Sequence, residues 1–210
     1  GHGAELCLYQ RDQEFEIQAD NLELMNSRNF ASEQALATLA CKKLTDPSEA
    51  RVLIGGLGMG YTLKSALDEL GETAEVLVME LVPDVVRWNQ GLLAHLAGNP
   101  LDDERVTVQV GDVAQMIKRS RGSFSAILLD VDNGPNALTS MDNHWLYSIA
   151  GLETAHAALK PNGILGIWSS DRDAGFAKRL SQVGFDVDEV PVRELGKKGG
   201  HHIVWIAERI

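Results

Sequence analysis

The chain has 210 residues, of which 44% are hydrophobic and 23% are charged, a composition typical of a soluble globular protein with one α/β core. Its 30 acidic and 19 basic residues give a formal net charge of −11, which disfavours a nucleic-acid partner and either favours a small cationic substrate or keeps the protein soluble. Because no apolar run approaches the roughly 18 residues of a membrane helix and no signal-peptide pattern opens the chain, we expect a cytoplasmic protein without membrane contact.

The first part of the chain predicts a small β element followed by a helix. Polar and apolar residues alternate over 5–8, 15–17 and 22–25, as in the strands of a small exposed sheet. Ser32 is typical of a helix N-cap, and the Ala- and Leu-rich stretch 33–44 predicts the helix that follows. We therefore expect a short N-terminal β-hairpin element over residues 1–29, ahead of a larger domain over residues 30–210.

The rest of the chain alternates strands with helices. Seven strands are predicted, at 51–54, 74–80, 106–110, 124–130, 164–168, 186–192 and 202–207. Helices are predicted at 62–70, 83–94, 113–119, 146–159 and 176–183. This alternation indicates an α/β Rossmann-like fold, a mostly parallel seven-stranded sheet with helices on both faces. The glycine-rich turn at 196–200 predicts that one of the last two strands runs antiparallel.

A glycine loop, Gly55-Gly56-Leu57-Gly58-Met59-Gly60, joins the first strand of this sheet to the next helix. Glycine permits a tight turn and a close approach of a ligand to the backbone. Glu80 ends the next strand, about 20 residues on, where an acid can accept hydrogen bonds from two ribose hydroxyls. Asp112 follows the third strand, where it can bind an adenine amine or cap a helix. Since ligands bind at the carboxyl ends of parallel strands, these features predict an adenosyl site.

Two acids, Asp130 and Asp132, follow the fourth strand. A carboxylate beside an adenosyl site can anchor an ammonium group or take a proton from an attacking amine, although both acids also fit the caps of a turn. Trp145, farther along, can form a wall of a substrate pocket. The cysteines and histidines show no metal-ligand spacing, so we expect no metal.

Several segments, in this order, resemble the polyamine aminopropyltransferases, the spermidine synthase family. They are 52–56, 78–86, Gly111-Asp112, Leu129-Asp130 with Gly134-Pro135, and 159–165. The resemblance implies a methyltransferase-type Rossmann fold behind a small β domain, and it implies a homodimer. It also implies transfer of an aminopropyl group from decarboxylated S-adenosylmethionine to a polyamine, such as putrescine.

The resemblance also assigns roles to residues by position. The donor-binding residues would be Gly55, Gly56, Gly58, Gly60, Glu80 and Asp112. Glu80 would hold the ribose and Asp112 the adenine, while Asp130 would be the base on the attacking amine. On the acceptor side we expect Glu33, Asp132 and Trp145 to bind the small-molecule amine.

Three departures from the family pattern keep two alternatives open. Gly58 stands where the family loop has an aspartate that faces the amine of the donor. Ser32-Glu33-Gln34 replaces the family's Tyr-Gln/His-Glu signature, and the segment 193–200 lacks the family's aromatic residue. The first alternative is a methyltransferase that uses S-adenosylmethionine itself on an unknown acceptor. The second is a non-catalytic module that binds a cofactor or another molecule.

Overall fold

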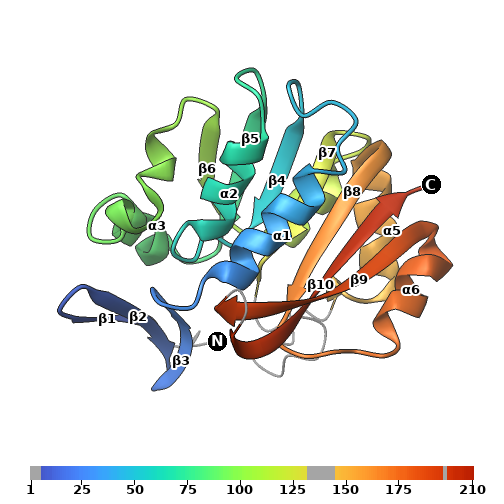
Figure 1. Cartoon of the computed structure of the whole chain (residues 1–210). Helices are drawn as coiled ribbons and strands as arrows, with labels where there is room; N and C mark the ends of the chain where they lie inside the picture. Colours follow the sequence, from blue (N-terminus) through green and yellow to red (C-terminus); the bar gives the residue numbers. More distant parts are fainter. Residues whose placement is uncertain (1–5, 132–144, 196–197) are drawn as a thin grey trace.

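The computed structural model describes residues 6–131, 145–195 and 198–210, which form a small sheet and a large sheet with its helices (Figure 1). The small sheet consists of β1 (Leu6–Arg11), β2 (Glu14–Ala19) and β3 (Leu22–Asn26). The large sheet consists of β4 (Arg51–Gly55), β5 (Glu75–Glu80), β6 (Val106–Val110), β7 (Phe124–Leu129), β8 (Leu159–Ser169), β9 (Phe185–Leu195) and β10 (Lys198–Arg209). The helices are α1 (Ala31–Cys41), α2 (Tyr61–Glu69), α3 (Pro83–Asn89), α4 (Val113–Arg119), α5 (Ile149–Ala158) and α6 (Phe176–Val183), with short 3-10 helices at Ala94–Ala97 and Pro100–Asp102.

The large sheet has the strand order β6-β5-β4-β7-β8-β10-β9. Five strands of this sheet run parallel, namely β6, β5, β4, β7 and β8. Between each of them and the next one along the chain, a helix crosses a face of the sheet, as a parallel connection requires. β10 runs antiparallel to both β8 and β9, so the two last strands form a hairpin. The predicted fold class, a mostly parallel seven-stranded α/β sheet, is confirmed.

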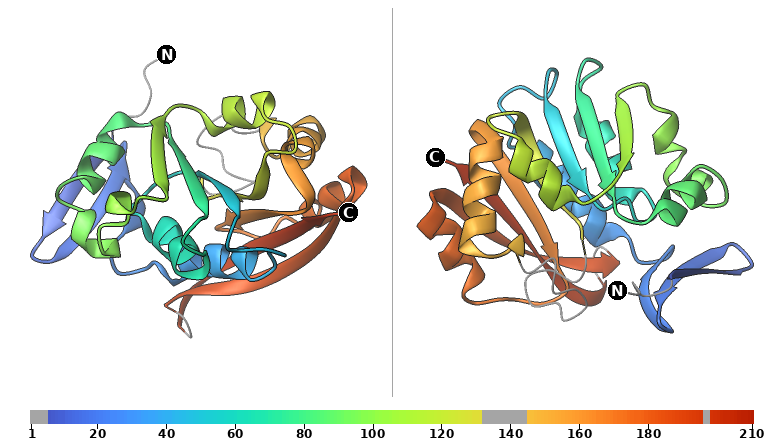
Figure 2. Two further views of the ribbon diagram at one scale, coloured as in Figure 1. Left: turned by 90° about the horizontal axis from the view of Figure 1, so that it is seen from above. Right: turned by 180° about the vertical axis from the view of Figure 1, so that it is seen from behind.

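Helices cover both faces of the large sheet (Figure 2). α1, α2 and α3 cover one face, and α4, α5 and α6 cover the other. On β4, Leu53 points to the α4 side while Val52 and Ile54 point to the α1 and α2 side, and all three are 0% exposed. The strand is apolar throughout because both of its faces are buried. None of the helices in the described part of the chain is long and apolar enough to cross a membrane.

The small sheet packs beside the glycine loop through its own apolar cluster. Phe15 and Ile17 of β2 lie in this cluster with Met59 of the loop and Tyr61 of α2. The three strands predicted in this part of the chain are present, and β2 pairs antiparallel with both β1 and β3. The division of the chain at residue 29 stays a prediction.

The first helix does not begin as predicted. α1 starts at Ala31, so Ser32 lies inside its first turn and is not the N-cap. The Ser32 hydroxyl instead donates a hydrogen bond to the Glu33 carboxylate (2.7 Å). Phe30, the residue before the helix, stacks on Tyr61 with the ring centroids 4.4 Å apart. Tertiary packing of an aromatic ring, rather than a capping side chain, therefore holds the start of this helix.

The helix predicted over 83–94 is shorter in the structure. α3 ends at Asn89, and a 3-10 helix follows after a turn. The Asn89 side-chain amide donates to the carbonyls of Val85 (2.9 Å) and Gly58 (2.8 Å). Asparagine and the nearby Gly91 are poor helix formers, and the bond to the glycine loop stabilises the break at this point.

Two boundaries near β8 also differ from the prediction. α5 begins at Ile149 rather than at 146, because Ser148 is its N-cap and accepts a hydrogen bond from Gly151 N (3.1 Å). Residues 160–163, predicted as a loop, form a bulge within β8, where the register with β7 shifts. Asn162 has a φ of +58° in this bulge, a conformation that asparagine tolerates.

Candidate functional site

The carboxyl ends of four parallel strands meet at one edge of the large sheet (Figure 1). β4, β5, β6 and β7 end there at Gly55, Glu80, Val110 and Leu129. Backbone hydrogen bonds join the segments that follow, from Asp130 N to Gly55 O (2.9 Å) and from Gly111 N to Glu80 O (2.8 Å). The structure thus brings the glycine loop, Glu80, Asp112 and Asp130 together at this edge.

The glycine loop lies against the end of β7 at a distance that no side chain allows. Gly56 has a φ of +89°, and a Cβ on it would lie 2.3 Å from the Asp130 carbonyl oxygen. Gly56 N also donates to Met79 O (2.9 Å) on β5. The requirement for glycine at this position is therefore both conformational and steric.

Glu80 is buried, with 8% of its surface exposed, and it holds the glycine loop. Its Oε2 accepts a hydrogen bond from Leu57 N (2.8 Å), and its Oε1 accepts one from Val82 N (2.9 Å). These two bonds compensate the desolvation of the carboxylate. A carboxylate can accept about four hydrogen bonds, so Glu80 retains capacity for the two ribose hydroxyls of the predicted ligand.

Asp112 is the N-cap of α4. Its Oδ1 accepts a hydrogen bond from Ala114 N (2.7 Å), and its side chain is only partly buried. Both roles considered for this residue are compatible, because capping uses one carboxylate oxygen and leaves the other. The contact with adenine stays a prediction.

Asp130 carries a carboxyl with a raised pKa. It is partly buried, and burial raises its pKa to about 6, against the opposing effect of a hydrogen bond from Thr62. Thr62 Oγ1 donates to Asp130 Oδ2 at 2.6 Å. Thr62 is not among the predicted site residues, because 68 residues separate it from Asp130 and a lone threonine in a helix carries no sequence signal.

Glu33 lies beside this pair on the first turn of α1. Its carbonyl oxygen accepts from Thr62 Oγ1 at 3.2 Å, a longer contact than the one to Asp130. The Glu33 carboxylate also lies near Tyr61, where it adds to the effect of burial in raising the pKa of the Tyr61 phenol to about 12. The structure therefore places Glu33 close to Asp130, although its contact with substrate stays a prediction.

The two remaining predicted residues lie on the segment after β7. Trp145 is partly buried among the apolar residues under α4 and α5, and the Lys118 ammonium lies 4.1 Å from its ring centroid. Asp132 lies outside the described residues. Tyr147, which the sequence does not single out, holds the chain next to Asp130, since its hydroxyl donates to Val131 O (3.1 Å).

The small sheet contacts the glycine loop at Gly58. This residue has a φ of +52°, and a Cβ on it would lie 2.7 Å from Met25 Cε of β3. On its other side the Gly58 carbonyl accepts the hydrogen bond from Asn89. The loop position that departs from the family pattern is therefore packed against a thioether side chain.

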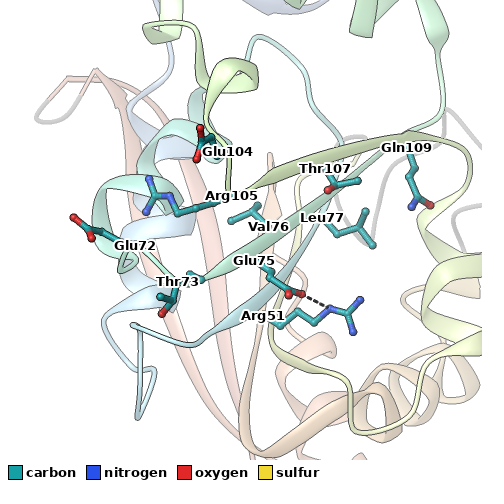
Figure 3. A pocket seen from close by; sticks show the side chains of 11 residues that line it. Arg51, Glu72, Thr73, Glu75, Val76, Leu77, Glu104, Arg105, Thr107 and Gln109 are labelled. Carbon is teal, nitrogen blue, oxygen red and sulfur yellow. Dashed lines mark ion pairs between the residues drawn. The ribbon is translucent and has the colours of Figure 1, made fainter.

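Two further kinds of site could occur among the described residues: a cluster of metal-ligating side chains and a hollow beside the sheet. Among them, no group of three or more His, Cys, Asp or Glu side chains is placed to hold a metal ion. A hollow of about 550 Å³ lies along β5 and β6 (Figure 3). It is lined mostly by polar side chains, among them Arg51 and Glu75, which form an ion pair (3.3 Å). None of the predicted site residues lines it.

Comparison with known proteins identifies a matching family and several similar proteins. Residues 30–171, about two thirds of the chain, match the family model described as spermine/spermidine synthase domain. Polyamine aminopropyltransferase 2 of Caldanaerobacter subterraneus subsp. tengcongensis is 37% identical over 86 residues, which cover 40% of this chain and 28% of that protein. The polyamine aminopropyltransferase of Bacillus mycoides is 29% identical over 152 residues, which cover 72% of this chain and 52% of that protein. The chain thus spans about half the length of these relatives or less.

A solved structure shows the same fold. Spermidine synthase from Thermotoga maritima matches 100% of this chain and 71% of its own, with a TM-score of 0.80 and 19% sequence identity. Because the identity is low, this likeness concerns the fold alone.

The contact between Gly56 and Asp130 leads to a stability prediction. We expect Gly56→Ala to lower the free energy of unfolding by about 2 to 4 kcal/mol, since it combines a left-handed residue with a clash against backbone. Gly122→Ala is the matched control, because Gly122 has a φ of +53° and nothing within 4 Å of its Cβ position. Urea titrations of both variants give the comparison, and equal losses of stability would show that the close approach to Asp130 contributes nothing.

The role of Glu80 in holding the loop leads to a second prediction. Glu80→Gln replaces an acceptor oxygen by an amide NH₂ that cannot accept from a backbone N–H. We expect the Leu57 or Val82 amide to exchange with solvent roughly tenfold faster or more, as loss of a hydrogen bond to a charged group implies. Glu75→Gln, at the exposed start of the same strand, is the control. Unchanged exchange at both amides in Glu80→Gln would show that the Glu80 carboxylate does not hold the glycine loop.

Proposed function

The chain belongs to the spermine/spermidine synthase family, and we propose that it is a transferase that moves an aminopropyl group from decarboxylated S-adenosylmethionine to a polyamine acceptor. One observation supports this most directly. The carboxyl of Asp130 lies at the edge of the sheet, with its backbone against the glycine loop and with a raised pKa. An acid beside an adenosyl site suits a reaction in which an amine attacks the adenosyl donor.

In this proposal the adenosine half of the donor binds to the glycine loop, Glu80 and Asp112. The glycines present backbone without side chains, so the donor can lie close to the turn between β4 and α2. Glu80 accepts from the ribose hydroxyls, and Asp112 accepts from the adenine amine. The fit rests on the chemistry of these groups: two carboxylates with spare acceptor capacity flank a loop whose glycines carry no side chains.

Asp130 acts as the base on the acceptor in this proposal. The neutral amine nitrogen attacks the propyl carbon next to the sulfonium, the C–S bond breaks, and methylthioadenosine leaves. The proton released from the attacking nitrogen passes to Asp130. Because the sulfonium is a good leaving group, the protein chiefly has to align the amine and keep it unprotonated. Glu33, Asp132 and Trp145 are proposed to bind the rest of the acceptor.

A second candidate is methyl transfer from S-adenosylmethionine. Gly58 supplies no carboxylate to the loop, and Met25 packs against it. The loop therefore lacks the acid that would recognise the amine of the decarboxylated donor in the resembling family. The proposed adenosine contacts serve both donors equally, so the donor must be identified by experiment.

We further propose a cytoplasmic homodimer that acts on a small-molecule amine rather than on a nucleic acid. The net charge of −11 supports a cationic substrate, since an acidic surface attracts cations and repels phosphates.

The test of function is a comparison of the two donors. Purified protein is titrated calorimetrically with decarboxylated S-adenosylmethionine and with S-adenosylmethionine, and each mixture is then supplied with a panel of diamines. The proposal expects tighter binding of the decarboxylated donor and formation of methylthioadenosine. Formation of S-adenosylhomocysteine instead would establish methyl transfer. Binding without either product would favour the non-catalytic module.

The role of Asp130 leads to a kinetic prediction. We expect Asp130→Asn to lower kcat by roughly 10²- to 10⁴-fold, as loss of a general base does, while the Kd for the donor stays unchanged. Since the pKa of Asp130 is raised to about 6, the carboxyl is ionised above that pH, and the activity of the unaltered protein should fall as the pH drops through 6. Asp68→Asn, an exposed acid of α2 paired with Lys64, is the control. An Asp130→Asn protein with normal kcat would exclude Asp130 as the base.

A further inference from the structure

We propose that Thr62 is the positioning residue for Asp130: its hydroxyl holds one carboxylate oxygen, Oδ2, and so leaves Oδ1 as the oxygen that meets the acceptor amine. This inference rests on the proposed function, because it concerns how the acid of that site is held. It assigns to α2 a role that neither the glycine loop nor the predicted acceptor residues fill.

The placement of Thr62 is determined by the glycine loop. Gly60, with a φ of +84°, is the N-cap residue of α2, and Thr62 is the second residue of that helix. Thr62 is 2% exposed, so its side chain is enclosed by protein. A β-branched side chain on a helix has few accessible χ1 rotamers. The hydroxyl is therefore presented to Asp130 in a fixed direction.

The hydroxyl lies between two acceptors of unequal strength. Its contact with Asp130 Oδ2 is 2.6 Å, and its contact with the Glu33 carbonyl oxygen is 3.2 Å. One hydroxyl proton serves one of them at a time, and the shorter bond to a charged oxygen is the stronger. Thr62 therefore donates to Asp130 and connects α2, the end of β7 and the first turn of α1. The hydroxyl of Ser32, which also lies on that turn, is already used by Glu33 Oε2 (2.7 Å).

This arrangement is compatible with the proposed proton transfer. With Oδ2 held by Thr62, the proton taken from the amine arrives on Oδ1. Oδ2 is then the carbonyl oxygen of the neutral acid, and it can still accept from Thr62. The buried hydroxyl therefore keeps a partner before and after the transfer, and no unpaired polar group is created.

The hydrogen bond also keeps Asp130 ionised. Burial raises the pKa of this carboxyl, and donation from Thr62 opposes that rise because it stabilises the charged form. Without the hydroxyl the pKa of Asp130 should rise further, toward the pH at which the reaction would run. The segments around this carboxyl carry other ionisable residues, namely Glu33 on the first turn of α1, Tyr61 next to Thr62 on α2, Glu80 at the end of β5 and Tyr147, which bonds to Val131. Substitutions at Thr62 leave all of them in place, so a change between variants reports on Thr62.

The experiment compares Thr62→Val, which keeps the shape but removes the hydroxyl, with Thr62→Ser, which retains it. Thr154→Val is the control, since the hydroxyl of Thr154 bonds to Ala150 O (2.7 Å) within α5, an element on the other face of the sheet. The first measurement is the pKa of Asp130 from the pH dependence of its side-chain carboxyl ¹³C shift. We expect Thr62→Val to raise this pKa by about one unit, and Thr62→Ser and Thr154→Val to leave it close to the original value.

The second measurement is the pH profile of transfer. We expect Thr62→Val to lower kcat at neutral pH by roughly tenfold, to shift the acidic limb upward by the same amount as the pKa, and to leave the donor Kd unchanged. Thr62→Ser should restore both. In the Asp130→Asn background, Thr62→Val should cost nothing more, because the two residues act as one unit.

The two measurements separate the inference from the function it rests on. If the protein transfers no aminopropyl group but Thr62→Val raises the Asp130 pKa, the proposed function fails and the positioning role stands. An unchanged Asp130 pKa in folded Thr62→Val overturns the positioning role, whatever the activity. A Thr62→Ser protein as impaired as Thr62→Val would also overturn it, since the hydroxyl would then not be the group that matters.

Discussion

The site depends on one backbone contact, the approach of Gly56 to the carbonyl oxygen of Asp130. A Cβ at Gly56 would lie 2.3 Å from that oxygen, so the glycine loop and the end of β7 touch without an intervening side chain. Backbone hydrogen bonds from Asp130 N to Gly55 O and from Gly56 N to Met79 O tie the same segments into the sheet. Main-chain contacts with the sheet therefore hold both the proposed cofactor loop and the proposed base, and a site supported by strands is positioned more precisely than one on a free loop.

Glu80 shows how one acid can serve both the fold and a ligand. Burying a carboxylate is costly, and here two backbone N–H groups, one in the glycine loop and one after β5, compensate it. The bond from Leu57 N holds the glycine loop against the end of β5. From the sequence, an acid at the end of a strand is predicted to contact a ligand. In this structure Glu80 accepts a hydrogen bond from the loop that would hold the ligand.

The family match and the small sheet meet at Gly58. The matched residues begin at 30, so β1, β2 and β3 lie outside them. Met25 of β3 nevertheless packs against Gly58, the loop position at which the chain departs from the family pattern. The surroundings of Gly58, the residue on which the identity of the donor depends, are thus built both from the matched residues and from the small sheet. The surroundings of the Asp130 carboxyl come from the matched residues alone in the contacts described above, because Asp130, Thr62 and Glu33 all lie within them.

The sequence by itself determined the alternation of strands and helices, the glycine loop and the acids at the ends of β5 and β7. Those features are local: periodicity identifies the elements, and parallel strands necessarily bring their carboxyl ends to one edge. Only the tertiary structure decided the contacts between distant segments. Thr62 meets Asp130 across 68 residues, and α3 ends where Asn89 bonds to Gly58, 31 residues earlier in the chain. Helix boundaries such as the start of α1, where Phe30 stacks on Tyr61, depend on partners of this kind. No local pattern encodes them, because a side chain's hydrogen bond or ring contact depends on which surface the folded chain places against it.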